Sequence, residues 1–481
     1  MISAGVVKRV FENGLTLLVR EDHTCASVAI FTYVKAGYLN ESDREVGISH
    51  VIEHMFFKGT RQRPVGRIAK ETKALGGYLN ASTIYDHTLY YTVLPASGFV
   101  QGLDIQADAL FNPAFDPEEL RKEIEVIIQE AKRKLDNPTA VAREKMFGLA
   151  FERHRMRRWR IGSEEGLRRL TRDDVVRFHK TYYGPENIIL AVTGDVTSDV
   201  VLREVEKRYA HVPRSQADKE SSPQEPPQTA FKFDRLTGDI QHSHVSIGFH
   251  TPPAFYPDSY ALEVLAFVLG QGRSSRLYRN VQQRRNLVTT VSAANYELKD
   301  VGLFFIEASG PAHKMEEAEA EIFQQIRQVQ THAVEEAELE KARNALQAGY
   351  LYSLEAPSGQ ASILARYEAL GGYQLAETYL SRLARVTADD LVRVARTYLH
   401  ARNCSVFEYV PRTWSGARES SDHRERLRSL LDLEAPGGLT GFSEAQVESP
   451  PPPAQPSVPG ETPIVTYDLS GGGRLLVKEN H

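Results

Sequence analysis

The chain has 481 residues, of which 25% are charged and 41% are hydrophobic, and its formal net charge at pH 7 is −5. The length favours two or more domains, and the mild acidity gives no reason to expect nucleic acid as a partner. The sequence contains no apolar run long enough to cross a bilayer, so the composition excludes a membrane-spanning protein and is typical of a large soluble one.

The N-terminus and the cysteines leave the compartment undetermined. Residues 1–20 lack the apolar core of a secretory signal, because Lys8 and Arg9 interrupt the valines around them. Cys25 and Cys404 are the only cysteines and lie far apart in the sequence, so no disulfide framework is expected. A soluble protein of the cytoplasm or the periplasm agrees with these observations.

The first strongly patterned segment is a predicted buried strand followed by a helix. Residues 27–34 are β-branched and aromatic, and residues 44–57 carry apolar side chains at helical spacing. That helix contains the sequence HVIEH, from His50 to His54. The two histidines are four positions apart, so both imidazoles project from one face and can bind one Zn²⁺. Glu53 can reach a water on that metal and act as general base.

A plainer interpretation is that these residues form only a polar helix face. The apolar surroundings weigh against it, because ionisable side chains on a buried helix need a partner and a metal supplies one. A catalytic zinc normally has three protein ligands and one open position. Two histidines therefore do not complete a site.

A second predicted helix offers the missing ligand. It begins with Asp116 as N-cap, Pro117 at the first position and Glu119 closing a capping box. Further along, Glu123 and Glu130 lie two turns apart on one face, with an aliphatic run between them. A metal ligand with a supporting carboxylate has this appearance, although acidic helix residues are more often simply solvated.

Residues 47–60 resemble the motif of the insulinase, pitrilysin and mitochondrial processing peptidase family of zinc metallopeptidases. In that family the third ligand is a glutamate in a segment similar to E-x-x-V-I-x-x-E, and Glu130 ends such a segment 76 positions after His54. The resemblance implies that His50, His54 and Glu130 hold one zinc ion per chain. It also implies that Glu53 is the catalytic base and that Glu123 supports the site without touching the metal.

Residues 76–90 resemble the family's N-A-x-T-x-x-D-x-T-x-Y strand pair. In relatives the asparagine of this motif holds the substrate backbone beside an exposed edge strand, so the resemblance implies that role for Asn80. An extended peptide that adds to a sheet edge gains backbone hydrogen bonds whatever its sequence. The alternative for Asn80 is a turn residue.

An internal repeat divides the chain. Residues 169–177 recur as residues 385–393, and the identities continue with Thr181-Tyr182 against Thr397-Tyr398 at the same separation of 216 residues. The chain therefore contains two copies of one unit, and we predict units at 1–213 and 230–413. Residues 215–229, polar and proline-containing, are predicted to be a hinge or linker.

The second copy has no zinc motif. Its first predicted helix, residues 260–269, contains no histidine pair, so this unit is expected to shape the substrate chamber. Residues 270–278 resemble a G-x-S-S-R-L segment of the family and are interpreted as a turn. Some relatives place an Arg and a Tyr of this unit over the peptide, whereas here Phe304 stands at the Arg position. This departure leaves open whether the chain cleaves alone or needs a partner.

The C-terminal region predicts a linker and a further repeat. Residues 414–463 become polar and include Pro450–Pro453, as semi-rigid linkers do. Residues 475–481 then match residues 17–23 at a separation of 458. We expect residues 464–481 to begin a further repeat unit, in a longer tandem protein.

The sequence thus predicts an α+β protein with two homologous units, each a mainly antiparallel sheet covered by helices. The resemblance implies that they form a clamshell around peptides or unfolded polypeptides, which a zinc-activated water hydrolyses. The alternative is a non-catalytic or partner-dependent subunit or scaffold of the same fold. A homologous partner unit, either the second half of a tandem chain or a dimer mate, is compatible with both.

Overall fold

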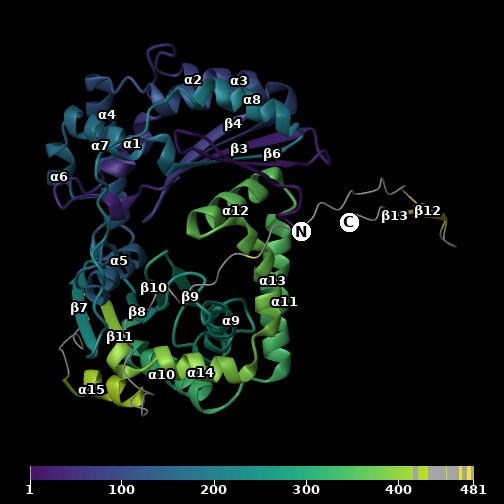
Figure 1. Ribbon diagram of the computed structural model, residues 1–481. Helices are drawn as coiled ribbons and strands as arrows, with labels where there is room; N and C mark the ends of the chain where they lie inside the picture. Colours follow the sequence, from purple (N-terminus) through teal and green to yellow (C-terminus); the bar gives the residue numbers. More distant parts are fainter. Residues whose placement is uncertain (1, 415–420, 432–450, 452–464, 469–473, 478–481) are drawn as a thin grey trace.

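The computed structural model describes residues 2–414, 421–431, 451, 465–468 and 474–477 (Figure 1). It contains two large mixed sheets, each with helices packed around it, and a separate two-stranded hairpin. The predicted α+β class with two mainly antiparallel sheets is therefore confirmed. None of the helices in these residues combines the length and the apolar character needed to span a bilayer.

The first sheet has six strands in the order β1-β2-β6-β3-β5-β4. Only β2 and β6 pair in parallel; the other neighbours are antiparallel. The strands are β1 (Val7–Val10), β2 (Thr16–Glu21), β3 (Ser27–Val34), β4 (Tyr78–Thr83), β5 (Thr88–Pro95) and β6 (Ile188–Gly194). The helices of this part are α1 (Ile48–Met55), α2 (Arg67–Ala74), α3 (Phe99–Phe111), α4 (Pro117–Leu135), α6 (Glu164–Arg169), α7 (Arg172–Tyr182) and α8 (Ser198–Tyr209).

The second sheet has five strands in the order β7-β11-β8-β10-β9. Again only one pair, β7 with β11, is parallel. The strands are β7 (Lys232–Gly238), β8 (Ser243–Thr251), β9 (Thr290–Glu297), β10 (Gly302–Gly310) and β11 (Cys404–Pro411). The helices are α9 (Ser259–Gly270), α10 (Met315–Thr331), α11 (Glu336–Ser353), α13 (Thr378–Arg385) and α14 (Ala388–Tyr398).

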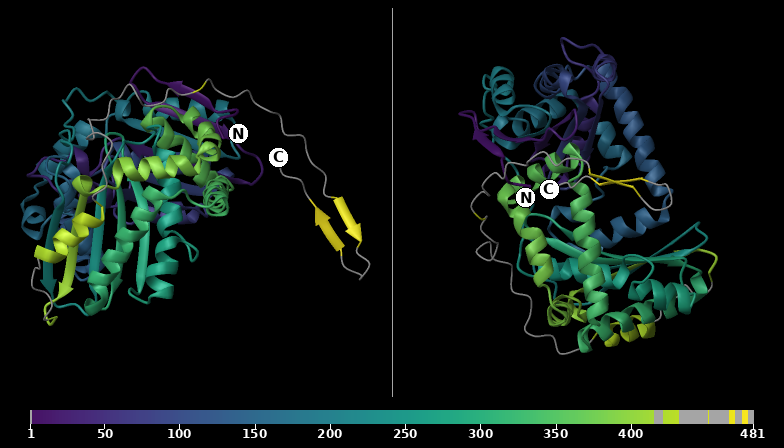
Figure 2. Two further views of the ribbon diagram at one scale, coloured as in Figure 1. Left: turned by 90° about the horizontal axis from the view of Figure 1, so that it is seen from below. Right: turned by 90° about the vertical axis from the view of Figure 1, so that its right-hand side faces the viewer.

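The two halves exchange one helix each. Helix α5 (Pro138–Ala150) packs against β8 and β11 of the second sheet, and α12 (Pro357–Leu370) packs against β3 and β6 of the first (Figures 1 and 2). Gly248 permits the approach of α5, because a Cβ there would lie 2.5 Å from Sδ of Met146. The domain bounds 1–213 and 230–413 remain a prediction. In the structure, each sheet is covered in part by a helix from the other predicted unit.

The exchanged helices explain why the central strands are buried along nearly their whole length, including the threonines Thr32 and Thr193. Both faces of β3 and β6 are covered, and all their residues except Ser27 are buried. Strand β5 alternates between buried and partly exposed residues, and β4 at the edge has no buried residue. Burial therefore declines across the sheet toward β4, which remains accessible.

The sequence repeat is also a structural repeat. Thr171 and Thr387 cap α7 and α14, and each accepts a hydrogen bond from the backbone N–H of an Asp three positions later, whose carboxylate accepts in return. Residues 215–229, predicted to be a hinge or linker, contain neither helix nor strand. They are nevertheless anchored, because the Glu225 carboxylate accepts from three consecutive backbone N–H groups at residues 152–154.

Two elements lie in the C-terminal region. Helix α15 (Ser421–Leu430) occurs within the predicted linker and packs on α10; most of that linker lies outside the described residues. Strands β12 (Val465–Asp468) and β13 (Arg474–Val477) pair Val465 with Val477, the register in which β1 and β2 pair Val7 with Val19. That these strands begin a further repeat unit stays a prediction.

A buried cluster of charges holds α15 in place. Nε2 of His423 donates to Oε2 of Glu319 at 2.6 Å and lies 3.5 Å from Oε1 of Glu408. Arg235 binds the other oxygen of Glu408. Burial lowers the pKa of His423, but the two carboxylates outweigh it and raise that pKa to about 10. The imidazole is therefore protonated at neutral pH.

We expect this contact to weaken at alkaline pH. Because the pKa of His423 is higher in the folded chain than the ordinary value of about 6.5, its stabilisation is complete below pH 6.5 and is lost as the pH rises through about 10. At pH 7, His423→Gln should reduce the free energy of unfolding by about 2 kcal/mol. Calorimetric melting temperatures of both proteins should converge between pH 8 and about 10.5; a constant difference would refute the assignment.

Candidate metal centre

The start of helix α1 is anchored by a loop residue. The helix begins after Gly47, whose φ of 98° is in the left-handed region that favours glycine. The buried Glu41 carboxylate accepts from the backbone N–H groups of Gly47 and Ser49, both at 2.9 Å. These bonds satisfy donors that a helix start leaves unpaired. They also explain why the helix begins at Ile48 and not at the predicted residue 44.

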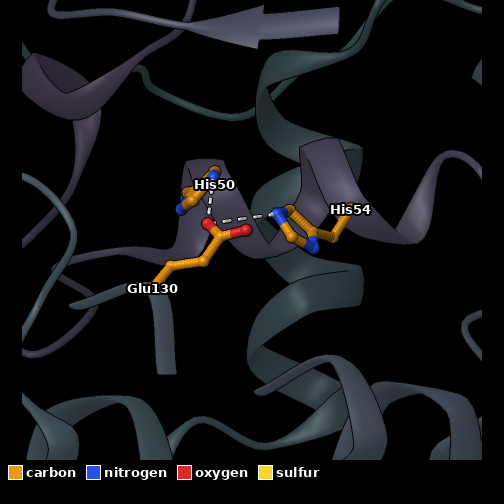
Figure 3. A group of neighbouring side chains, drawn as sticks. All are labelled: His50, His54 and Glu130. Carbon is orange, nitrogen blue, oxygen red and sulfur yellow. Dashed lines mark ion pairs between the residues drawn. The ribbon is translucent and has the colours of Figure 1, made fainter. Parts of the chain in front are cut away.

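The structure brings the three predicted ligands together. Nε2 of His50 and Nε2 of His54 lie 3.7 and 3.9 Å from Oε2 of Glu130, which projects from α4 (Figure 3). The three ligand atoms lie within 4.8 Å of one another. Zinc binds nitrogen and oxygen at about 2.0–2.2 Å, so two atoms on one ion can be about 4 Å apart. The donor set and its spacing therefore fit zinc.

Burial keeps the imidazole of His50 in the neutral form that can bind a metal. Desolvation, followed by repulsion from His54, lowers the pKa of His50 to about 3. The imidazole is therefore neutral at physiological pH. A neutral ring has a free electron pair on one nitrogen, as metal binding requires.

A carboxylate orients the second histidine. Nδ1 of His54 lies 2.9 Å from Oε2 of Glu123, and Nζ of Lys58 lies 2.6 Å from Oε1 of the same residue. Burial raises the pKa of Glu123, but hydrogen bonds from Lys58 and His54 outweigh it and hold the pKa below its ordinary value. The ionised carboxylate accepts the Nδ1 proton, which leaves the Nε2 electron pair directed toward Glu130.

Removing this orientation should weaken metal binding without abolishing it. We expect Glu123→Gln to lower the affinity for Zn²⁺ about 10–100-fold, as carboxylates behind a ligand histidine do in other sites. Competition with a zinc-binding dye measures this affinity. Glu119→Gln is the matched control, because Glu119 lies on the same helix and its carboxylate pairs, within the described part of the chain, with Lys122 alone. Equal affinities in both variants would contradict the role of Glu123.

The start of α4 differs slightly from prediction. Asp116 is the N-cap and accepts from the backbone N–H groups of Glu118 and Glu119, as expected. The predicted return bond from Glu119 is not formed, and its carboxylate pairs with Lys122 instead. The helix nevertheless extends from Pro117 to Leu135 and carries both functional glutamates on its buried side.

Glu53 lies beside the edge strand of the first sheet. It hydrogen-bonds with both the side chain and the backbone of Thr83 in β4. Burial raises the pKa of Glu53, although the bonds from Thr83 and the charge of His54 oppose this. A carboxylate with a raised pKa can accept a proton and release it again near neutral pH.

Asn80 lies on this same strand and is not a turn residue. It is exposed, its Nδ2 donates to Oη of Tyr91 at 3.2 Å, and its Oδ1 accepts from the backbone N–H of Ala81. Strand β4 pairs with β5 on one side only. The backbone of β4 can therefore receive an extended chain on its open edge.

The second half cannot bind a metal in the corresponding place. The positions 216 residues after the three ligands are Ala266, Gly270 and Leu346, none of which offers a ligand atom. Phe304 is completely buried in β10, so it cannot contact a substrate. Sequence reasoning missed Glu41, Lys58 and Thr83. No motif marks them: Glu41 caps the helix from a loop six and eight residues before the groups it binds, and Lys58 and Thr83 contact residues far away in the chain.

Two family models match the chain. Residues 16–162 match "Insulinase (Peptidase family M16)", and residues 169–346 match "Peptidase M16 inactive domain". The first match contains the three candidate ligands and Glu53, and the second begins at the end of the first half and continues into the second half, which carries no counterpart of these residues at the positions 216 residues later.

Curated relatives align over most of their length. An "Uncharacterized zinc protease" of Rickettsia felis is 30% identical over 386 residues, which are 80% of this chain and 92% of the relative. The "Zinc protease PqqE" of Helicobacter pylori is 28% identical, covering 80% and 88%. A "Probable mitochondrial-processing peptidase subunit beta" of Arabidopsis thaliana is 26% identical, covering 83% and 77%.

Solved structures share the fold. A protease from Helicobacter pylori superposes with a TM-score of 0.80 at 26% identity, covering 84% of this chain and 99% of that one. A structure described as a peptidase M16 inactive domain from Pseudomonas fluorescens superposes with a TM-score of 0.78 at 16% identity, covering 84% and 98%. The latter likeness concerns the fold alone.

Proposed function

The chain belongs to the insulinase (M16) family of peptidases, and on this basis we propose that it is a zinc-dependent endopeptidase acting on peptides or unfolded protein segments. The observation that carries the proposal is the convergence of His50, His54 and Glu130 from two helices, with Glu53 beside them. Relatives described as zinc proteases support it.

Different residues would supply metal binding and proton transfer during hydrolysis. His50, His54 and Glu130 would hold the zinc ion, with Glu123 orienting His54. When bound, zinc acts as a Lewis acid that lowers the pKa of water to about 7 and polarises a carbonyl. The Glu53 carboxylate accepts the proton of the attacking water and transfers it to the nitrogen of the leaving amine.

Substrate geometry would follow from the open edge of β4. A peptide that adds as an extra strand gains hydrogen bonds from the β4 backbone, and Asn80 is placed to bind its main chain. Thr83 bonds to Glu53, so this strand carries the peptide past the general base. Such binding requires an extended chain, which favours unfolded segments over folded proteins.

A digest of a reduced, alkylated protein beside its folded form tests the proposal. We expect cleavage of the unfolded form only, its loss with a zinc chelator, and its recovery when Zn²⁺ is restored. Absence of zinc from the purified chain together with absence of cleavage would refute the proposal.

The second candidate is a partner-dependent or non-catalytic subunit of the same fold. The match of residues 169–346 to a peptidase M16 inactive domain favours this candidate. The burial of Phe304 also favours it, because this side chain cannot contact a substrate. In this case the chain would bind zinc yet cleave nothing alone. Cleavage that starts only when a homologous chain is added would identify a partner-dependent enzyme.

A further inference from the structure

Lys134 is a half-buried cation beside the metal centre. It lies one turn after the ligand Glu130 on α4, and residues four apart on a helix share a face, with Cβ atoms about 5–6 Å apart. Burial and repulsion from His54 lower the pKa of His50, and repulsion from Lys134 adds to this effect. The ammonium therefore lies near the place where a scissile bond would meet the metal.

This ammonium has no counter-ion of its own. The other two cations in the last turn of α4 are exposed and have carboxylates near them: Lys132 pairs with Glu164 at 3.0 Å, and Arg133 lies 3.8 Å from Glu130. Lys134 is the least exposed of the three, yet within the described residues it forms neither an ion pair nor a hydrogen bond. A partly desolvated, unpaired charge is stabilised when an anion binds it.

The carboxylates around Lys134 are engaged elsewhere. Burial, followed by repulsion from Arg160, lowers the pKa of Lys134, whereas Glu144 and Glu130 oppose this fall. Glu130 is the proposed metal ligand. Oε1 of Glu144 accepts from Nε and Nη2 of Arg160 at 2.9 and 2.6 Å. An incoming anion would therefore be the first direct partner of the ammonium.

Arg160 adds a second cation to this region. Its guanidinium neutralises Glu144, which is buried, and its Cζ lies 5.0 Å from the centre of the Tyr85 ring, a cation–π contact. In the part of the chain that the structure describes, Nη1 of Arg160 has no hydrogen-bond partner. The pair with Glu144 removes the negative charge that would repel an anion, and Nη1 remains available as a donor.

Tyr38 connects Arg160 with the general base. Burial, followed by the charges of Glu41 and Glu53, raises the pKa of the Tyr38 phenol, and the positive charge of Arg160 opposes this rise. One phenol thus experiences the charges of both Glu53 and Arg160. Arg160 therefore lies near the general base, as Lys134 lies near a metal ligand.

Arg160 also stands at the end of the proposed peptide path. Thr83, the last residue of β4, hydrogen-bonds with Glu53. The next residue, Ile84, lines a cavity of about 660 Å³ beside β4, together with tyrosines of the second half. Tyr85, on which Arg160 stacks, follows directly. Because a strand advances about 3.3 Å per residue, a peptide extended along β4 passes Arg160 within a few residues of the bond beside Glu53.

We propose that Lys134 and Arg160 form a subsite for a carboxylate of the substrate peptide, so that the chain favours cleavage close to an acidic group. Lys134 is the principal donor, and charge-assisted bonds of this kind contribute more than neutral ones. An aspartate or glutamate side chain and the C-terminal carboxylate of a short peptide offer the same group. The inference rests on the proposed function, because it takes the occupant to be part of a peptide substrate.

The test compares peptides that differ by a single charge. Decapeptides of uncharged residues with blocked ends carry one glutamate at each position in turn, and a matched set carries glutamine. We expect the wild-type chain to cleave one glutamate peptide with a kcat/KM at least about tenfold above its glutamine partner, as for one charged hydrogen bond. Lys134→Met, which keeps an unbranched stem without the ammonium, should reduce this ratio below about twofold.

Two further variants separate the charge at this position from its packing. Lys134→Arg should retain the preference for glutamate, because it keeps the positive charge. Lys132→Met is the matched control, since Lys132 lies in the same turn of α4, is exposed and pairs with Glu164. It should retain the full preference, although it also removes a cation from the end of the helix. Zinc content and melting temperatures verify that each variant is folded and loaded with metal.

The ends of the peptide distinguish the two sources of the carboxylate. A glutamine peptide with a free C-terminal carboxylate is compared with its amidated form. A gain in kcat/KM of at least about tenfold that Lys134→Met abolishes identifies the terminal carboxylate as the ligand. A gain that only an internal glutamate produces identifies the side chain.

Binding separates the subsite from the chemistry. Fluorescence anisotropy of the labelled glutamate and glutamine peptides on Glu53→Gln should show the same preference, and adding Lys134→Met should abolish it. Equal ratios in wild type and Lys134→Met would overturn the subsite, as would the absence of any preference for glutamate or for a free C-terminus. If no peptide is cleaved, the proposed peptidase function fails, and the anisotropy ratio alone then decides the subsite.

Discussion

His50→Ala is expected to reduce bound zinc from about one ion per chain to a small fraction of that, and to abolish peptide hydrolysis. Two ligands, His54 and Glu130, would remain, whereas a catalytic zinc site needs three. Zinc content after gel filtration, measured by mass spectrometry of the metal, gives the first readout. Hydrolysis of an unfolded protein gives the second.

The matched control for this change is His332→Ala. His332 is exposed and lies in the second half, where its Nδ1 hydrogen-bonds with Thr331, its neighbour in the chain. It should retain zinc and activity. If His50→Ala binds zinc as tightly as the wild type, the ligand set is wrong.

Glu53→Gln is expected to lower kcat about 10²–10⁴-fold while zinc content stays unchanged. The amide has the shape of the carboxylate and can keep a hydrogen bond to Thr83, but it cannot accept the proton of the attacking water. Because substrate contacts are retained, KM should change little. Steady-state kinetics and metal analysis on one preparation measure both effects.

Glu125→Gln serves as the control for this second change. Glu125 lies on α4 near the site helices but points outward, where it pairs with Arg168. Its replacement should leave kcat within about twofold. Activity of Glu53→Gln equal to that of this control would exclude Glu53 as the general base.

These two substitutions separate metal binding from proton transfer. His50→Ala should remove the metal and the activity together, whereas Glu53→Gln should remove activity alone. The non-catalytic alternative predicts a different result. The chain would bind zinc through His50 but show no peptide hydrolysis, so Glu53→Gln would change nothing. The same pair of variants therefore decides between the two proposed functions.

Local periodicity made several elements predictable. Two histidines four positions apart share a helix face whatever surrounds them, so the motif on α1 could be recognised directly. The start of α4 at Asp116-Pro117 and the caps of α7 and α14 depend on neighbours within a few residues. The repeat was visible for the same reason, since aligned identities need no tertiary model.

The bounds of the helices and the contacts between different segments were harder to predict from the sequence. Helix α1 begins later than its apolar pattern suggests, because the Glu41 side chain in the preceding loop binds the backbone at Gly47, a contact that no helix pattern reveals. The exchange of α5 and α12 between the sheets could not be predicted from the sequences of these helices, because an apolar helix face does not indicate which sheet it will cover.

The sequence by itself determined the chemistry that this chain can offer: a histidine pair, a neighbouring carboxylate and a second acidic helix, in one of two repeated units. Those features are set by spacing along single helices, where geometry is fixed by 3.6 residues per turn. Tertiary structure alone decided that Oε2 of Glu130 meets both imidazoles, that Lys58 and Glu123 orient His54, and that tyrosines from the second half surround a cavity beside β4. These contacts depend on the packing of segments far apart in the chain, which no local pattern encodes.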